Sequence, residues 1–200
     1  MLRGGWLSLR RHERPDKFML RLEDNPPMLF PIGEDIADIC GQWWVARTKS
    51  RNEKAFARTL LQWEIAYFLP LTEKVTKRRG RAIKSLLPLF GGYVFFCGSS
   101  QTKTQALTTH RIAQVIEVVD QKGLVRDLTQ IHRALASGAK LDPHPHLQEG
   151  ARCRVVAGPL EGTEGILLRK KNQTRLLLKV DILGQCAALE MDSDLLESLE

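Results

Sequence analysis

The sequence has few of the features that mark secreted, membrane-spanning or metal-binding proteins. It contains four cysteines in 200 residues, and none of them forms a C-x-x-C pair, which argues against a disulfide framework and a four-cysteine zinc site. No apolar run approaches the roughly 20 residues that span a membrane. The arginine-rich start lacks an apolar stretch of signal-peptide length. We therefore expect a cytoplasmic protein that does not contact a membrane.

The motifs of common enzyme classes are also missing. There is no nucleophile elbow, no phosphate-cradling glycine loop with its lysine, and no His-Glu-x-x-His helix. His144 and His146 lie two apart between prolines, a pattern more typical of a linker than of a metal site. We expect a protein that is not an enzyme and that needs neither a cofactor nor a metal ion.

What the chain does have is an excess of positive charge. It carries 30 Lys and Arg against 23 Asp and Glu, a formal net charge of +7, which favours a polyanionic partner. The segment 74–84 has six basic residues and no acidic one, and its pattern predicts a hairpin. Around Gly80 at its tip lie four candidate nucleic-acid contacts: Lys77, Arg78, Arg79 and Arg81. The alternative is a solvated hairpin tip without a partner.

Composition and periodicity divide the chain into four parts. Residues 1–40 mix arginines and prolines without periodicity, and we expect a disordered or loosely attached extension. Residues 41–138 alternate strand and helix patterns and form the first domain. Residues 139–148 contain two prolines and predict an extended linker. Residues 149–200 form the second domain.

The first domain is predicted to be an antiparallel sheet with helices on one face. A capping box of Ser50 and Glu53 starts a helix whose buried stripe includes Phe56, Leu60 and Trp63. The other elements are strands over 43–48, 65–69, 86–90, 93–97 and 113–119, a short helix over 102–109, and a longer helix that ends at Gly138.

The second domain has strand-like runs at 152–155, 164–170, 175–180 and 185–191, separated by glycine-rich turns. So many short strands in so few residues predict a small, mostly closed β-barrel. The fold class is therefore α+β, an α/β sandwich followed by a small barrel.

Aromatic residues gather in two segments of the first domain, at 43–44 and 90–96. Strand alternation sends half of them into the core and the other half to a sheet face that no helix covers. There they stack bases or dock a partner protein. The alternative for each of them is ordinary core packing.

Several segments in order resemble the NusG-like transcription elongation factors, which join an NGN domain to an SH3-like KOW domain. The matching segments are W-W-V-A-R-T-K at 43–49, Pro70, L-F-G-G-Y-V-F-F at 89–96, and the strand after Arg111. The run V-V-A-G-P-L-E-G-x-x-G at 155–165 is similar to a KOW motif. The hairpin spacing and T-K-S-R-N-E-K-A at 48–55 resemble the specialised, RfaH-like branch of antiterminators.

The resemblance implies a factor that binds RNA polymerase at its clamp and suppresses pausing or termination. It places the polymerase contact at Trp44, Phe90, Tyr93 and Phe95. Lys49 and Arg111 match positions that touch the non-template DNA strand. Ile182 and Leu183 match the KOW contact region for a ribosomal protein or a termination factor. We expect the factor to be monomeric.

Two matters stay open at the level of sequence. The alternative function is that of a ribosome-associated KOW protein, which binds structured RNA through the barrel and the basic hairpin. Whether the two domains touch, and so whether the polymerase-binding face is masked, does not follow from the sequence.

The β character of 176–180 and 184–189 favours a barrel for the second domain over the helical hairpin that RfaH-like domains can form.

Overall fold

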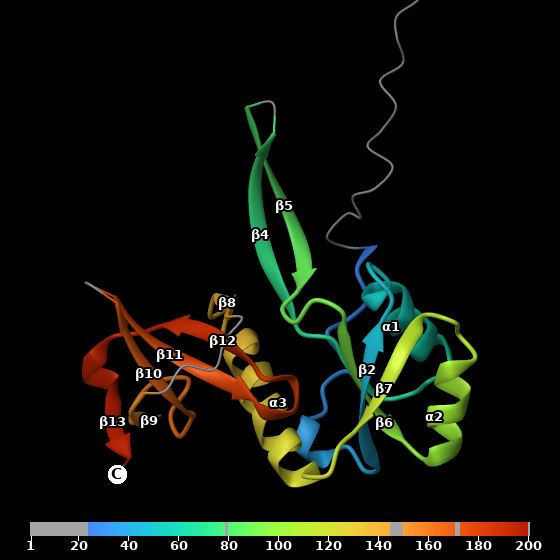
Figure 1. The fold of residues 1–200 in the computed structure, drawn as a ribbon. Helices are drawn as coiled ribbons and strands as arrows, with labels where there is room; N and C mark the ends of the chain where they lie inside the picture. Colours follow the sequence, from blue (N-terminus) through green and yellow to red (C-terminus); the bar gives the residue numbers. More distant parts are fainter. Residues whose placement is uncertain (1–23, 79, 145–149, 171–172, 200) are drawn as a thin grey trace, which may run out of the picture.

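The computed structural model describes residues 24–78, 80–144, 150–170 and 173–199 (Figure 1). Its N-terminal half is a five-stranded antiparallel sheet with the order β1-β3-β6-β2-β7. The strands are β1 (Leu29–Phe30), β3 (Tyr67–Phe68), β6 (Tyr93–Gly98), β2 (Gln42–Thr48) and β7 (Ile112–Glu117). Central strands β2 and β6 are rich in aromatic and β-branched residues, which suit a pleated surface that is buried on both sides.

Helices cover both faces of this sheet, so the prediction of an open face is wrong. On one face, Trp44 and Phe96 pack against Phe56 and Leu60 of α1 (Glu53–Gln62), and α2 (Ser100–Leu107) adds Ala106. On the other face, apolar side chains of the sheet pack against α3 (Gln121–Ala136); they include Trp43, Val45 and Phe95. Adjacent residues of a strand point to opposite faces, and here each face meets a helix.

The start of α1 differs from the predicted capping box. The helix begins at Glu53 with Asn52 as its N-cap and no capping side-chain hydrogen bond. Glu53 Oε1 instead accepts a hydrogen bond of 2.7 Å from the Gly92 amide, which ties the helix to the turn before β6. Phe56 and Leu60 are buried as predicted, whereas Trp63 follows the last turn and is 37% exposed.

The other two helices carry the local signals of their ends. Ser99 caps α2 through a reciprocal capping box with Thr102, so this helix starts two residues before the predicted position. Asp120 caps α3 by accepting a hydrogen bond from the Gly123 amide. The chain leaves α3 through Gly138, whose φ of +79° is the left-handed conformation that glycine adopts without strain.

Residues 24–40 are part of the fold, in contrast to the expected loose extension. Strand β1 pairs with β3, and the turn η2 (Ile36–Asp38) lies against α3. Ile36 is fully buried, and Asp35 forms an ion pair with Arg133 of α3 at 3.4 Å. The remainder of the predicted extension, residues 1–23, lies outside the described residues.

The basic hairpin is present and projects away from both sheets (Figure 1). It consists of β4 (Leu71–Arg78) and β5 (Arg81–Pro88), which pair with each other as a separate two-stranded sheet. The predicted strand over 86–90 is thus divided, because residues 86–88 complete the hairpin while Leu89 and Phe90 enter the core.

The C-terminal half is a six-stranded antiparallel sheet with the order β13-β9-β10-β11-β12-β8. Its strands are β8 (Leu141–His144), β9 (Arg152–Val155), β10 (Glu164–Lys170), β11 (Gln173–Val180), β12 (Gln185–Glu190) and β13 (Leu196–Leu199). The four predicted strand runs are confirmed, and part of the predicted linker forms the edge strand β8. Closure of this sheet into an SH3-like barrel stays a prediction.

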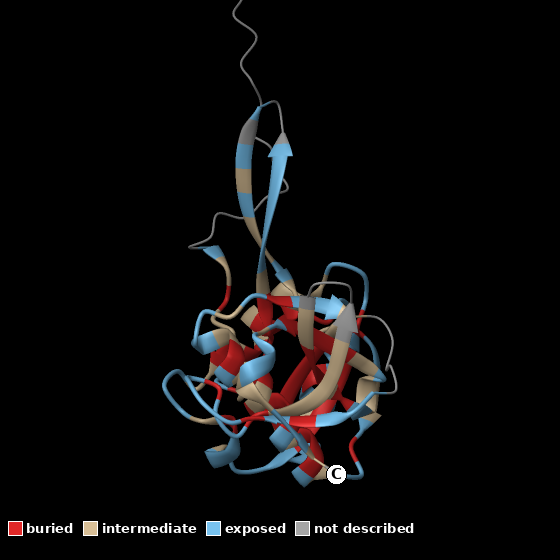
Figure 2. Ribbon diagram, turned by 90° about the vertical axis from the view of Figure 1, so that its left-hand side faces the viewer, coloured by how far each residue is buried: buried red, intermediate tan, exposed pale blue. Residues whose placement is uncertain are grey.

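Helix α3 lies between the two halves and contributes to the packing of both (Figure 1). Its buried residues belong to one cluster with Phe95 of the first sheet and Leu178 of the second. Two α3 side chains also accept hydrogen bonds from backbone amides of the C-terminal half, Asp127 from Asp181 at 3.2 Å and Gln130 from Glu164 at 2.7 Å. The two halves are therefore docked on each other, and Figure 2 shows buried residues concentrated in the body below the exposed hairpin.

Candidate polymerase and nucleic-acid interfaces

The aromatic residues predicted to contact polymerase do not form one exposed patch. Trp44, Phe90 and Phe95 are 4%, 1% and 0% exposed, and Trp44 lies on the opposite face of the sheet from Phe95. The reason is that α1 and α2 cover one face and α3 covers the other. These three side chains are core residues in the docked structure, which corrects the expectation of an aromatic surface.

Tyr93 differs from these three residues because it remains at the surface. It starts β6 directly after Gly92, whose φ of +84° turns the chain at this corner. Its side chain is half-buried and packs on the same cluster as Phe90 and Phe95, whose rings meet edge-to-face at 6.5 Å. Tyr93 is therefore the one predicted polymerase contact that a partner reaches in this structure.

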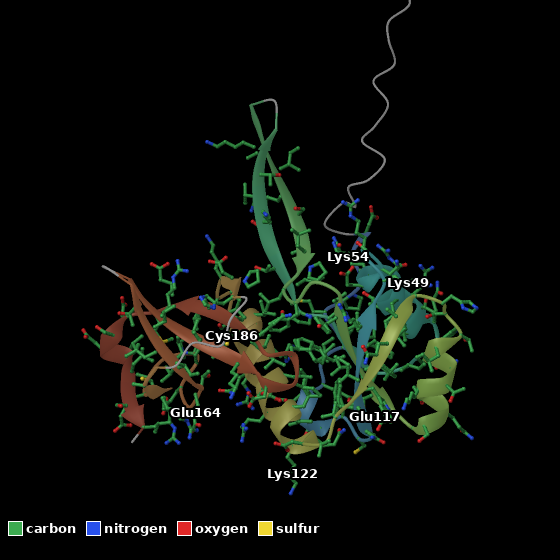
Figure 3. All side chains as sticks on the ribbon, in the orientation of Figure 1. Lys49, Lys54, Glu117, Lys122, Glu164 and Cys186 are labelled. Atoms are coloured by element: carbon green, nitrogen blue, oxygen red, sulfur yellow. The ribbon has the colours of Figure 1, made fainter. Side chains whose placement is uncertain are left out.

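Lys49 and Arg111, the predicted contacts to the non-template strand, lie on neighbouring loops. The Lys49 amide donates a hydrogen bond of 2.8 Å to the carbonyl oxygen of Arg111, which fixes the two loops side by side. Arg111 Nη1 donates to Asn52 Oδ1 at 3.1 Å, so its guanidinium is held at the start of α1, whereas Lys49 is exposed. Figure 3 shows Lys49 at the edge of the N-terminal sheet.

Two further basic residues in these loops were not predicted from the sequence. Arg51 and His110 have φ values of +59° and +55°, which non-glycine residues seldom adopt, and both side chains are exposed. Backbone strain of this kind gathers at functional sites. No sequence motif marks these positions, because the turn geometry depends on the pairing of the two loops.

Lys54 lies nearby but has a structural role. Its Nζ donates a 2.5 Å hydrogen bond to the carbonyl oxygen of Leu86, which ties α1 to the base of the hairpin. Burial is the main cause that lowers the pKa of Lys54, and the neighbouring charge of Arg58 lowers it further. This lysine is therefore less available to a phosphate than Lys49 is.

The hairpin presents a separate basic surface. Lys74 and Lys77 are exposed on β4, and Lys84 on β5 pairs with Glu73 at 3.1 Å. Arg79 lies outside the described residues, as do the side chains of Arg78 and Arg81. Lys77 lies near the far end of β4. Figure 1 shows this hairpin projecting away from the body of the molecule, so it forms a surface separate from the N-terminal sheet.

The candidate partner residues of the C-terminal half face α3. Ile182 and Leu183 lie in the turn η3 (Asp181–Leu183), and both pack, partly buried, against the cluster that α3 shares. The neighbouring Asp181 amide donates to the Asp127 carboxylate. Burial raises the pKa of Asp127 to about 6, although Arg126 and Lys179 act in the opposite direction. This region is therefore occupied by the chain's own helix.

Neither a metal site nor a membrane-spanning helix is found in the described part of the chain. Residues 24–78, 80–144, 150–170 and 173–199 contain no group of three or more His, Cys, Asp or Glu side chains placed to hold a metal ion. No helix in these ranges is long and apolar enough to cross a membrane.

Comparison with known proteins identifies the family. The family model described as NusG, "Transcription termination factor nusG", matches residues 41–140, which is half of the 200-residue chain. The chain belongs to the NusG family. The matched segment contains the N-terminal sheet from β2 onward, the hairpin and all three helices. Members of this family are transcription factors rather than enzymes.

Solved structures give two similar chains of low sequence identity. A structure of the domain interaction in Thermotoga maritima NusG is 14% identical, with 80% of this chain and 97% of that chain covered and a TM-score of 0.42. A chain of the MjSpt4:Spt5 complex in conformation B is 12% identical, with 79% and 97% covered and a TM-score of 0.22. No curated relative matches the chain in sequence.

Proposed function

We propose that this NusG-family protein is a bacterial elongation or antitermination factor that binds RNA polymerase through its N-terminal half. The observation that carries the proposal is the pairing of the Lys49 and Arg111 loops within the segment that matches the family. The two cations lie at one edge of the sheet, where they contact the phosphates of an exposed non-template DNA strand. Such contacts are independent of base sequence and weaken with salt.

The polymerase clamp contacts the surface around Tyr93 and the α3 side of the sheet. Phe90 and Phe95 lie beneath Tyr93 and form the apolar layer that supports it. In the docked structure α3 also holds the C-terminal half. We infer that polymerase binding competes with this docking, so that the docked protein is a less active state. Binding then shifts a two-state equilibrium and involves no chemistry by this chain.

The C-terminal half acts as the KOW domain and recruits a ribosomal protein or a termination factor. Its contact residues, Ile182 and Leu183, pack against the α3 cluster. Separation from α3 therefore exposes this surface at the same time as the polymerase face. We place the protein in the specialised, RfaH-like branch, which the hairpin spacing and the segment 48–55 resemble.

A second candidate function is binding to structured RNA on the ribosome. The observation in its favour is the exposed basic hairpin, which carries Lys74 and Lys77 away from the body. RNA binding through these residues falls steeply as salt is raised. Docking through Tyr93 and its apolar support depends far less on salt, so salt dependence separates the two functions.

The test is recovery of core RNA polymerase from the native host on the wild-type chain and on two variants. Tyr93→Ala removes the half-buried aromatic contact at the surface, and Trp63→Ala is the control, because Trp63 is an exposed aromatic residue outside the proposed surface. We expect the wild type and Trp63→Ala to recover polymerase and Tyr93→Ala to lose it. Recovery of ribosomes without polymerase, whatever residue stands at 93, would favour RNA binding instead.

A further inference from the structure

A groove lies where α3, the η2 turn and the turn before β10 meet. Its volume is about 720 Å³, within the range of roughly 300–1,000 Å³ that small-molecule sites occupy. Its walls come from both halves of the chain, and the junction between domains is a common place for such sites. Figure 3 labels Lys122 on α3 and Glu164 on β10, which line the groove from the two halves.

The apolar part of the groove comes from three elements. Ile39 follows η2, Trp43 belongs to β2, and Val125 lies on α3. Ile39 and Val125 supply aliphatic groups, whereas the Trp43 side chain is 1% exposed. A flat apolar body fits this kind of lining.

The charge of the groove is positive. Lys122, Arg126 and Arg133 line it from α3, and Glu164 is the acidic residue of the lining. Glu164 is already paired with Arg152 at 3.4 Å and Arg154 at 2.6 Å, and the hydrogen bond from Arg154 holds its pKa below the usual range. The two α3 arginines also have carboxylate neighbours, since Arg133 pairs with Asp35 at 3.4 Å and Arg126 lies 3.9 Å from Asp127. Their side chains are nevertheless 63% and 68% exposed, and exposed ion pairs are weak. An anion is therefore attracted to their side of the groove.

Two buried polar atoms of the lining residues have no hydrogen-bond partner within the described chain. They are Trp43 Nε1 and Thr129 Oγ1, in residues that are 1% and 8% exposed. Leaving such a group unpaired costs about 1–3 kcal/mol. By contrast, the lining amides of Gln121 and Gln130 are used, the first by the Trp43 backbone and the second by the Glu164 amide.

We propose that this groove binds a small organic anion, an aromatic ring system that carries a phosphate, sulfonate or carboxylate group. The ring lies against Ile39, Trp43 and Val125, and the anionic group faces Arg126 and Arg133. A hydrogen-bond acceptor of the ligand pairs with the Thr129 hydroxyl. Because both halves supply the walls, the bound ligand stabilises the docked arrangement by mass action, which would make it a regulator of the proposed polymerase binding.

The probe for this site is 1-anilinonaphthalene-8-sulfonate, which combines an aromatic body with one anionic group. It is titrated into the full chain and followed by fluorescence and by calorimetry. We expect saturable binding of one molecule per chain. The double variant Arg126→Gln with Arg133→Gln should bind about tenfold or more weakly, since charge-assisted contacts are lost. Arg47→Gln, an exposed arginine of β2 outside the groove, is the matched control and should keep wild-type affinity.

A second variant separates a ligand contact from a structural effect. Thr129→Val keeps the shape of the side chain and removes the unpartnered hydroxyl. We expect it to unfold at the same or a higher denaturant concentration than the wild type, while its affinity for the probe falls. The proposal is overturned if the probe does not saturate, or if Thr129→Val and the double arginine variant both bind it as tightly as the wild type. Neither outcome bears on polymerase binding, which is measured separately.

Discussion

Asp127 of α3 allows the docking of the two halves to be tested through its charge. Its side chain is 10% exposed, and its carboxylate accepts a hydrogen bond from the Asp181 amide of η3 in the C-terminal half. Burial raises its pKa from an ordinary value of 3.8 to about 6, with Asp120 adding to the rise and Arg126 and Lys179 opposing it. The folded protein therefore prefers this carboxyl in its neutral form.

The sign of the pH effect follows from the raised pKa. In the unfolded chain the group ionises near pH 4, whereas in the folded chain it ionises near pH 6. The folded state is therefore penalised progressively as pH rises from about 4 to about 6, and the penalty is constant above about 7. A difference of this size corresponds to at most about 3 kcal/mol. Solvent reaches part of the carboxyl and reduces this, so we expect about 1–2 kcal/mol.

The variant Asp127→Asn tests this reasoning directly. The asparagine oxygen still accepts from the Asp181 amide, but it carries no charge. We expect the variant to be more stable than the wild type by about 1–2 kcal/mol at pH 8, with the difference vanishing near pH 4. Asp127→Leu removes the acceptor, leaves the Asp181 amide unpaired, and should lose about 1–3 kcal/mol relative to Asp127→Asn.

Chemical denaturation between pH 4 and pH 8 measures these differences. Glu161→Gln provides the control, because it removes one carboxylate at an exposed position. The reasoning is refuted if Asp127→Asn is less stable than the wild type at pH 8. Parallel stability curves of the two proteins over the whole range would refute it equally.

Two other substitutions test one contact in each half of the chain. Glu53→Ala removes the acceptor of the hydrogen bond from the Gly92 amide at 2.7 Å and should lower the free energy of unfolding by about 1–3 kcal/mol. The control Glu161→Ala, at an exposed position, should leave the free energy of unfolding unchanged in the same denaturation assay. Gly165→Ala places a methyl group 2.6 Å from the carbonyl oxygen of Leu177, and this overpacking should cost about 1–3 kcal/mol. Gly91→Ala is its control, because the added carbon meets no atom within 4 Å, and it should leave the denaturation midpoint nearly unchanged. Equal denaturation midpoints for the two glycine variants would contradict the packing around Gly165.

The periodic elements could be predicted from the sequence, because their patterns are local. Leu128 and Ile131 of α3 are three residues apart and are both fully buried, as helical periodicity predicts. Asp127 and Thr129 lie outside that apolar stripe, yet both are buried. Asp127 accepts a hydrogen bond from the Asp181 amide of the C-terminal half, and Thr129 lines the groove to which both halves contribute. The burial of these polar residues depends on domain docking, for which the sequence contains no periodic signal.

The errors at the candidate site have a similar cause. Trp43 and Trp44 are adjacent, and alternation correctly places them on opposite faces of the sheet. The sequence does not show that each face meets a helix, so it predicts one of these faces as an open surface. The capping box at Ser50 failed for a related reason: Glu53 bonds to the Gly92 amide, a contact between segments 39 residues apart.

The hydrogen bonds of α3 also give a means to shift the balance between docked and open protein. Gln130→Ala removes the acceptor of the Glu164 amide at 2.7 Å, and a bond of this kind contributes about 1 kcal/mol net. If polymerase competes with docking as proposed, weaker docking raises the apparent affinity for core polymerase by roughly fivefold, since the binding-competent fraction increases. Gln114→Ala on the exposed part of β7 is the matched control and should bind polymerase as the wild type does.

Asp127→Asn strengthens docking at pH 8 and should therefore bind polymerase more weakly. The polymerase affinities of the two α3 variants are thus expected to change in opposite directions. The proposal is contradicted if both α3 variants bind polymerase with equal affinity although their stabilities change in opposite directions as expected. That result would show that docking does not mask the polymerase face.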